Sequence, residues 1–191
     1  IKEVMPILQK YTTWIEDNFK CENGLYKAPF QASGMFNSPR QGTVYPVDFN
    51  TALATHALYM SALGDILNDK DLTFQYKRMY FSLKTRINSF MWDEETGFYY
   101  DLDENAEKLQ RKTIAGFWPL LAEIPNEDKA VALISHLNNP NTFGLDHPFP
   151  SLSEYNPNIS KSSISIVFLR VCLPELKTFA KIVFASDVSP I

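Results

Sequence analysis

Apolar residues recur every three or four positions along four stretches of the chain, a spacing that predicts amphipathic helices. The four stretches are residues 2–19, 48–67, 72–90 and 126–138. A fifth stretch, residues 112–123, is apolar on nearly all sides and predicts a buried helix despite Pro119. Asn68 and Asp69 leave a short connection between the second and third helices, which we therefore expect to pack as an antiparallel hairpin.

Polar residues refine this pattern. Asp48 is expected to cap the second helix and Asn126 the last one, because short polar side chains accept hydrogen bonds from first-turn N–H groups. His56 falls on an apolar stripe and is predicted to be a hydrogen-bonded core residue, whereas His136 is predicted on a solvated helix face. Glu95 to Gly97 predict a turn before a short extended run. The predicted fold class is all-α, built of antiparallel helix pairs with short extended segments in the loops.

Two long segments lack a helical period, residues 21–47 and 139–157. The first is punctuated by glycine and proline but is rich in aromatic residues, and a loop of this length inside a compact domain is usually functional. It contains Ser33 to Arg40, where backbone-bending residues, a cation and several amide or hydroxyl groups precede a helix. Such a loop at the mouth of a helical scaffold predicts the binding of a polar ligand.

Composition narrows the classes of partner. With 191 residues, 45% hydrophobic and 14% aromatic, the chain predicts one globular domain. A net charge of -4 without a basic block argues against nucleic acid as a partner. No apolar run is long enough to predict a membrane span, and no signal peptide precedes the first helix. The sequence starts at Ile1 rather than Met, so a leader that has been removed is possible and no compartment is predicted. The histidines and cysteines are scattered and do not have the spacing of metal ligands.

The segment Gly34 to Arg40, followed by Val47 to Asn50, resembles the clan of (α/α)6-barrel glycoside hydrolases. This clan includes the mannosylglycerate and glucosylglycerate hydrolases, the processing α-glucosidases and the trehalases, and the chain is most similar to the mannosylglycerate hydrolase-like branch. Further motifs follow in the family's order: Trp92-Asp93 with Tyr99-Tyr100-Asp101, Phe117 to Leu120, and Pro148 to Ser153. The resemblance implies a partial (α/α)6 toroid, since the family's barrel has six inner and six outer helices.

The resemblance also implies inverting hydrolysis of an α-linked sugar without a cofactor. This chemistry needs one carboxyl group to protonate the leaving oxygen and a second to activate water. In the family the acid is the aspartate between Gly-Met or Gly-Leu and Asn-Ser-Pro, and here that position holds Phe36. The family's base is a glutamate much later in the chain, beyond the part that aligns. We therefore expect a glycoside hydrolase-like domain that binds an oligosaccharide or small glycoside, with impaired hydrolysis.

Each candidate residue has a structural alternative. Phe36 is either a platform for sugar stacking or a packed loop ring. Asn37 and Arg40 either bind a ligand through their amide and guanidinium groups or brace the loop. Asp48 and Asp146 are the candidate catalytic carboxylates, although Asp48 is also the expected helix cap. The remaining substrate-binding candidates are Tyr45, His147 and Trp118, the last of which is alternatively a core residue.

We assign residues 1–157 to the family-like part of one domain, and residues 158–191 to a diverged, frameshifted or truncated tail in which the composition changes to Ser, Ile and Val. Five predicted helices cannot close a twelve-helix barrel. The expected partner is therefore the remainder of its own barrel, and the isolated chain is expected to expose apolar helix faces and to self-associate. Two alternatives to the enzyme are a non-catalytic carbohydrate-binding or regulatory module and a helical scaffold without a sugar site.

Overall fold

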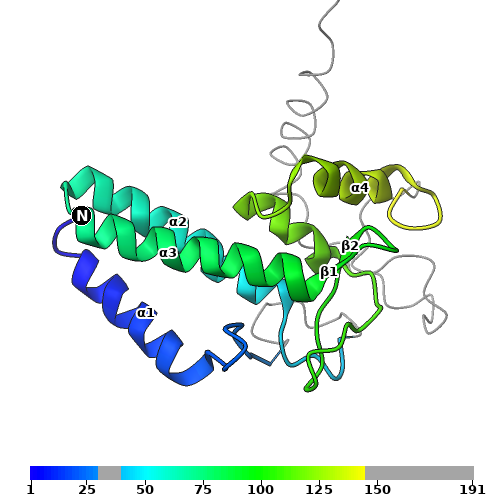
Figure 1. Ribbon diagram of the computed structural model, residues 1–191, viewed down its shortest axis with the longest axis horizontal. Helices are drawn as coiled ribbons and strands as arrows, with labels where there is room; N and C mark the ends of the chain where they lie inside the picture. The colour runs from blue at the N-terminus through cyan, green and yellow to red at the C-terminus, as the bar shows by residue number, and fades with distance from the viewer. Residues whose placement is uncertain (30–39, 145–191) are drawn as a thin grey trace, which may run out of the picture.

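The computed structural model describes residues 1–29 and 40–144, and the structural statements below concern these residues. They are mainly helical with one short strand pair, so the predicted all-α class is confirmed (Figure 1). In chain order the elements are α1 (Met5–Phe19), α2 (Val47–Leu67), α3 (Lys70–Arg86), the π-helical turn η2 (Ile87–Met91), β1 (Trp92–Asp93), β2 (Phe98–Tyr99), the 3-10 helix η3 (Ile114–Ala122) and α4 (Glu127–Asn138).

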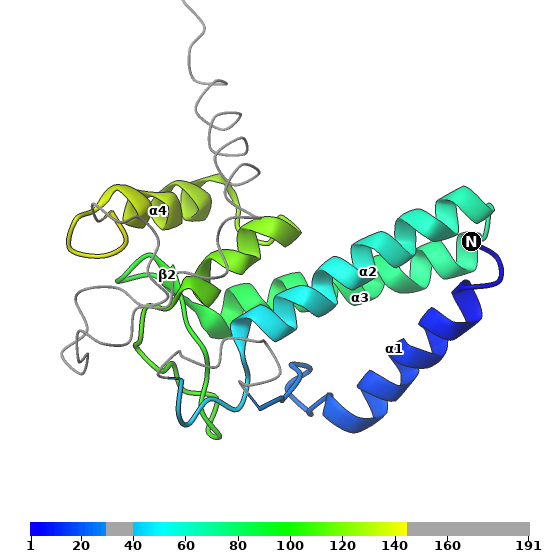
Figure 2. The same cartoon turned by 180° about the vertical axis from the view of Figure 1, so that it is seen from behind.

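Helices α2 and α3 form the predicted antiparallel hairpin (Figures 1 and 2). Asn68 adopts a left-handed backbone conformation between them, and Asp69 caps α3 by accepting a hydrogen bond from Leu72 N–H at 3.0 Å. Gly64 lets the helices approach closely, since a Cβ at that position would lie 2.7 Å from Thr73 Oγ1. The facing sides bury the apolar stripes that the sequence predicts, namely Leu53, Ala57 and Met60 of α2 and Leu72, Tyr76, Tyr80 and Leu83 of α3.

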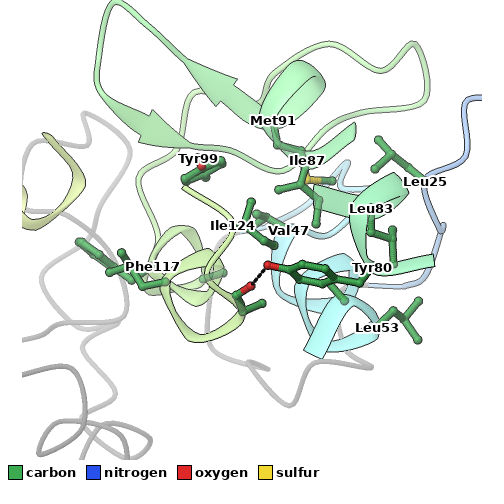
Figure 3. Packing of buried hydrophobic residues seen from close by; sticks show 14 of the residues in the cluster. Leu25, Val47, Leu53, Tyr80, Leu83, Ile87, Met91, Tyr99, Phe117 and Ile124 are labelled. Atoms are coloured by element: carbon green, nitrogen blue, oxygen red, sulfur yellow. Dashed lines mark hydrogen bonds between the residues drawn. The ribbon is translucent and has the colours of Figure 1, made fainter. Parts of the chain in front are cut away.

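The 3-10 helix η3 packs against α2 and continues the hydrophobic core toward β2 (Figure 3). Gly116 permits this contact, because a Cβ there would lie 2.3 Å from the Phe98 ring. Tyr80 donates a hydrogen bond to Ala122 O at 2.9 Å. The predicted burial of this segment is confirmed, but its α-helical geometry is not. Pro119 lacks an N–H and disfavours the α conformation of the residue before it, which is consistent with the tighter winding.

One polar cluster ties α1 to the hairpin. His56 Nε2 lies 2.7 Å from Thr12 Oγ1, and Tyr76 donates its hydroxyl proton to the same oxygen at 3.2 Å. Thr12 in turn donates to Leu8 O at 2.9 Å, so its oxygen accepts from both neighbours and the His56 ring nitrogen is the donor. His56 is thus hydrogen-bonded as predicted, in a half-buried position.

The buried side of α1 differs from its predicted apolar stripe. The helix buries Met5, Thr12 and Ile15. Four residues of the predicted stripe are instead between 49% and 67% exposed: Val4, Ile7, Tyr11 and Trp14. Apolar helix surface is therefore uncovered in the described part of the chain, as expected from the sequence.

Replacing Thr12 by valine, which keeps its shape but removes the hydroxyl, is expected to lower the free energy of unfolding by about 1–3 kcal/mol. The reason is that His56 and Tyr76 lose the acceptor they share. Urea-induced unfolding followed by circular dichroism measures the change. Thr13→Val is the matched control, because Thr13 is exposed and its hydroxyl bonds to Gln9 O within the same helix. Equal losses in the two variants would contradict this role of the cluster.

Candidate functional site

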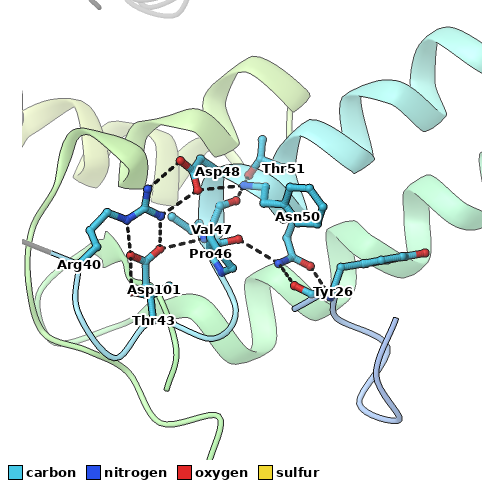
Figure 4. A network of polar contacts seen from close by, with 10 residues as sticks. Tyr26, Arg40, Thr43, Pro46, Val47, Asp48, Asn50, Thr51 and Asp101 are labelled. Carbon is cyan, nitrogen blue, oxygen red and sulfur yellow. Dashed lines mark hydrogen bonds and ion pairs between the residues drawn. The ribbon is translucent and has the colours of Figure 1, made fainter. Parts of the chain in front are cut away.

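Of the loop that the sequence predicts as the ligand site, Ser33 to Arg40, only Arg40 lies within the described residues, so Phe36 and Asn37 are not placed. Asp146 and His147 also lie outside them. The chain on either side of the loop is described, and both stems meet at the first turns of α2 (Figure 4). The contacts of the two stems therefore show which residues fix the ends of the candidate loop.

Asn50 holds the stem that precedes the loop. Its side-chain amide donates to Tyr26 O at 2.9 Å and accepts from Tyr26 N–H at 2.8 Å, and it also donates to Pro46 O at 2.9 Å. Asn50 is completely buried, so these bonds do not compete with water. Ala28 N–H adds a bond to Val44 O at 3.1 Å. The first stem is thereby joined to α2 and to the second stem.

Arg40 holds the stem that follows the loop. Its Nη1 and Nη2 atoms donate to the two oxygens of Asp48 at 2.8 Å each. Its Nε and Nη2 atoms donate to the two oxygens of Asp101 at 2.7 Å each (Figure 4). Arg40 and Asp48 are each 1% exposed, and Asp101 is 6% exposed. Bidentate ion pairs in such a position fix geometry and are costly to break.

The same carboxylates serve the N-terminus of α2. Asp101 accepts a hydrogen bond from Val47 N–H at 2.9 Å, and Asp48 accepts one from Phe49 N–H at 3.0 Å. The prediction that Asp48 is the N-cap is wrong, because α2 begins at Val47 with Pro46 in the N-cap position. Pro46 has no side-chain acceptor, and Asp101 supplies one from a distant part of the chain.

The cluster contains one positive and two negative side chains and lies where the helix dipole favours an excess of negative charge. Burial alone would lower the pKa of Arg40, but its hydrogen bonds to Asp48 and Asp101 raise that pKa above its ordinary value, so the guanidinium stays charged. Thr43 also donates to Asp101 Oδ2, at 3.2 Å. All four carboxylate oxygens therefore accept hydrogen bonds within the described structure.

This geometry gives Arg40 the bracing role that was one of its two alternatives. Asp48 is the buried partner of Arg40, a role that is neither the helix cap nor the catalytic carboxylate expected for it. Direct contact of either residue with a ligand stays a prediction. Tyr45 is half-buried, and its backbone exchanges two hydrogen bonds with Leu102 at 3.1 Å. Trp118 is half-buried in η3. The roles of Tyr45 and Trp118 in substrate binding also stay predictions.

Sequence reasoning did not single out Asp101 and Asn50 as site residues, although both belong to the motifs that carry the family resemblance. Each is a polar residue beside apolar or aromatic residues in the sequence. Asp101, for example, directly follows Phe98, Tyr99 and Tyr100. A buried polar side chain needs a hydrogen-bonding partner, so this pattern is the signal that would have indicated a buried network.

His136 is buried where α4 packs against the turn between β1 and β2. Strands β1 and β2 pair antiparallel across the predicted turn, and α4 packs on that turn so closely that a Cβ on Gly97 would lie 3.3 Å from Ala132 Cβ. His136 is consequently only 8% exposed, and its predicted position on a solvated face is wrong. Its Nε2 lies 2.9 Å from Thr96 O, an atom that can only accept, so Nε2 carries the proton.

The free energy of unfolding is expected to fall as the pH is lowered from about 7 through 6.5. Burial lowers the pKa of His56 and of His136, and positive Lys112 adds to the effect at His136. Between these lowered values and the ordinary pKa, the unfolded chain binds more protons than the folded chain, so stability rises with pH. Urea unfolding across this range measures the slope. His136→Gln, which keeps a donor to Thr96 O, is expected to reduce the slope, and an unchanged slope would contradict this assignment.

A cavity of about 440 Å³ lies between α1 and α3, with Glu16, Lys20, Phe74 and Arg78 among its lining residues. It reaches the first stem at Tyr26, but none of the described candidate residues lines it, so we assign the candidate site to the loop stems.

Within residues 1–29 and 40–144, no group of three or more His, Cys, Asp or Glu side chains is placed to hold a metal ion. No helix in this part is both long and apolar enough to cross a membrane.

The sequence model of a family described as a mannosylglycerate hydrolase MGH1-like glycoside hydrolase domain matches residues 1–160. The chain is 50% identical over 161 residues to an uncharacterized protein of Borreliella burgdorferi, which covers 84% of this chain and 34% of that protein. It is 37% identical over 54 residues to the cytosolic neutral trehalase of Kluyveromyces lactis, covering 28% of this chain and 7% of that enzyme. The chain thus spans about a third or less of the length of these relatives.

Solved structures share the fold. A sialidase aligns with a TM-score of 0.75 at 16% identity, covering 81% of this chain and 15% of the other, and this likeness concerns the fold alone. A mannosylglycerate hydrolase of Thermus thermophilus, in complex with Tris and D-glycerate, aligns with a TM-score of 0.53 at 26% identity, covering 61% and 27% of the two chains. Another structure of that hydrolase contains glucose. The predicted partial (α/α)6 toroid is confirmed.

Proposed function

This chain belongs to the family of mannosylglycerate hydrolase MGH1-like glycoside hydrolase domains. From that premise we propose that it binds an α-linked oligosaccharide or small glycoside through the loop Ser33 to Arg40. It is a glycoside hydrolase-like domain related to mannosylglycerate hydrolase and trehalase. The chain covers only 34% of the length of a relative that is 50% identical to it. The identity of the sugar, its linkage and the reaction of the longer protein are therefore also proposed.

The observation that carries the proposal is the anchoring of both loop stems in the protein interior. Asn50 binds both backbone polar groups of Tyr26, and two bidentate contacts hold Arg40. A ligand-binding loop loses less conformational freedom on binding when its ends are already fixed, and this preorganisation raises affinity. Side chains that act on ligands are commonly carried on loops positioned by a rigid scaffold in this way.

Hydrolysis by the inverting mechanism is the finer part of the proposal. Phe36 stands at the family's acid position and has no proton to give. Asp48 and Asp101, the carboxylates that hold the second stem, do not replace the acid in the described geometry, because each of their oxygens accepts a hydrogen bond within the cluster. We therefore propose that this chain binds its glycoside with impaired hydrolysis, and that the base comes from a part of the protein outside this chain.

A non-catalytic carbohydrate-binding or regulatory module is the second candidate function. The observation in its favour is the aromatic ring at the acid position, since the C–H faces of sugars pack well on aromatic rings. In this case Phe36 contributes to affinity, and the fold is kept for binding alone. The effect of Phe36→Asp on hydrolysis separates the two candidates.

Sugar ligands are expected to stabilise the 191-residue protein against thermal unfolding. A ligand present at 100 times its Kd raises the free energy of unfolding by about 2.7 kcal/mol. Methyl α-glucoside, methyl α-mannoside and D-glycerate are the probes. D-glycerate is bound in one structure of the related hydrolase, and glucose in another. Asn37→Ala is expected to remove the stabilisation. Asn18→Ala, at an exposed position of α1, is the matched control. No stabilisation by any probe at millimolar concentrations would favour a helical scaffold without a sugar site.

A further inference from the structure

The cavity between α1 and α3 has a buried floor and an exposed rim (Figures 1 and 2 show the two helices). Its volume of about 440 Å³ lies within the range of roughly 300–1,000 Å³ that is common for small-molecule sites. The lining residues Thr12, Tyr26 and Tyr76 are at most 5% exposed, whereas Phe74, which also lines the cavity, is 64% exposed. A small molecule can therefore enter beside Phe74 and be partly enclosed.

Two polar stripes form the walls of this cavity. On α1 the lining residues recur at intervals of four, namely Thr12, Glu16 and Lys20. On α3 the polar lining residues recur at intervals of three and four, namely Asp71, Gln75, Arg78 and Ser82. Residues at such intervals lie on one face of a helix. Helices that pack directly, such as α2 and α3, face each other with apolar side chains, so polar walls suit a polar occupant of the space between them.

Polar groups of both walls have hydrogen-bonding capacity that the fold does not use. Glu16 Oε1 accepts from Lys20 Nζ at 2.6 Å and from the Tyr26 hydroxyl at 3.2 Å. Within residues 1–29 and 40–144, Glu16 Oε2 accepts no hydrogen bond, and the side chains of Gln75 and Arg78 make none. In the same part of the chain no ion pair joins α1 to α3. Donors and acceptors therefore face one space without pairing across it.

The balance of charge in the lining indicates which ligand fits. Lys20 and Arg78 balance Glu16 and Asp71, so the lining carries no net charge, and an anion or a cation would meet repulsion as well as attraction. A neutral molecule with many hydroxyl groups suits this set, because carboxylates accept from hydroxyls while ammonium, guanidinium and amide groups donate to them. The exposed ring of Phe74 offers an apolar surface to the C–H face of a sugar.

We propose that the cavity between α1 and α3 is a second carbohydrate-binding site, for a neutral mono- or disaccharide. None of its described lining residues belongs to the loop Ser33 to Arg40, so this inference does not rest on the function proposed for that loop. The two sites adjoin at Tyr26, which lines the cavity and whose backbone is held by Asn50 at the first stem. A saccharide in the cavity is thus bound beside the stem without using the loop.

Methionine methyl groups report on the two sites separately. Met79 lines the cavity and Met35 belongs to the loop, while Met5, Met60 and Met91 are buried in the core. The 191-residue chain is labelled with ¹³C-methyl methionine and titrated with glucose, mannose and maltose, and Met79→Leu identifies the Met79 resonance. This resonance is expected to shift with a Kd of about 1 mM, and the resonances of the core methionines are expected to stay in place.

Variants of exposed residues test where the sugar binds. Phe74→Ala is expected to weaken the binding reported by Met79 roughly 2- to 10-fold, because the sugar loses its aromatic surface. Phe81→Ala is the matched control, because Phe81 lies on the same helix and is 59% exposed but does not line the cavity. Asn37→Ala, in the loop, is expected to leave the Met79 shift unchanged.

No shift of Met79 at sugar concentrations of about 10 mM would overturn the proposal, as would equal binding by Phe74→Ala and Phe81→Ala. A Met79 shift that disappears in Asn37→Ala would also overturn it, because the cavity would then only respond through Tyr26 to a sugar bound at the loop. A saturable shift with inorganic phosphate or glycine but not with the sugars would assign the cavity to a charged ligand instead. If Met35 shifts and Met79 does not, the loop site is supported and the cavity site fails, whereas the reverse result supports the cavity site alone.

Discussion

Replacing Arg40 by methionine is expected to lower the free energy of unfolding by about 3–5 kcal/mol, the range for removing one partner of a buried ion pair. Methionine keeps much of the apolar stem but leaves Asp48 and Asp101 facing each other in the interior without a cation. Both are at most 6% exposed, so water does not compensate them. Arg40→Lys is expected to lose a smaller part of the stability, because an ammonium group cannot make the bidentate contacts of a guanidinium.

Urea unfolding monitored by circular dichroism measures this loss. Arg78→Met is the matched control, because Arg78 is exposed and its described contact is with the Phe74 ring, so a change within about 0.5 kcal/mol is expected. Adding Asp48→Asn and Asp101→Asn to Arg40→Met is expected to recover part of the loss, since the unpaired charges are then removed. A loss below about 1 kcal/mol for Arg40→Met would show that the cluster does not hold the stem.

Phe36→Asp is expected to increase the hydrolysis of α-glycosides with poor leaving groups by about 100- to 10,000-fold, the usual contribution of a general acid. A chimera in which the aligned residues of this chain replace their match in the Borreliella burgdorferi relative is the suitable context, because the second carboxylate is expected outside this chain. The reason is chemical. An alkoxide leaves slowly unless it is protonated, and phenylalanine cannot protonate it.

The leaving group provides the control for this experiment. Aryl glycosides with a strongly acidic phenol as leaving group need little protonation, so their hydrolysis is expected to change little in Phe36→Asp. Phe36→Asn, which has the shape of aspartate without its acidity, is the matched variant and is expected to stay at the starting rate. If the unsubstituted chimera already hydrolyses alkyl glycosides rapidly, another carboxylate is the acid. Asp146 is then the first residue to replace, and Asp48 the second, because both Asp48 oxygens accept hydrogen bonds from Arg40. If Phe36→Asp binds sugar and remains inactive, the carbohydrate-binding module is favoured.

The periodic pattern predicted the helices well because burial along a helix repeats every three to four residues. Local signals succeeded in the same way, as at Asn126, whose side chain accepts a hydrogen bond from Lys129 N–H at 3.1 Å. The same local reasoning was wrong at Asp48. The acceptor at the start of α2 is Asp101, whose bond to Val47 spans 54 positions, and no pattern within one helix contains that information.

The candidate site was predictable in part. The loop motif directed attention to Arg40 and Asp48, and the structure shows that the two are bonded to each other. Their bracing contacts depend on a third residue that the motif does not contain, 61 positions after Arg40. His136 is a similar case, since its burial results from a turn that lies 40 positions earlier in the chain. The burial and hydrogen bonding of a residue cannot be predicted from its own segment when they depend on a partner in a distant segment.

Asp101 has a consequence for the order in which the fold assembles. During synthesis from the N-terminus, α2 and α3 are complete before residue 101 is added, and their contacts are between neighbouring segments. The bond from Arg40 to Asp101 must close a span of 61 residues, and the entropy of closing it is lost before the contact contributes. The α2–α3 hairpin therefore has the lower contact order, and the loop stems are locked together after it. A ribosome-bound chain that ends before Asp101 contains the hairpin but not the second carboxylate that closes the site.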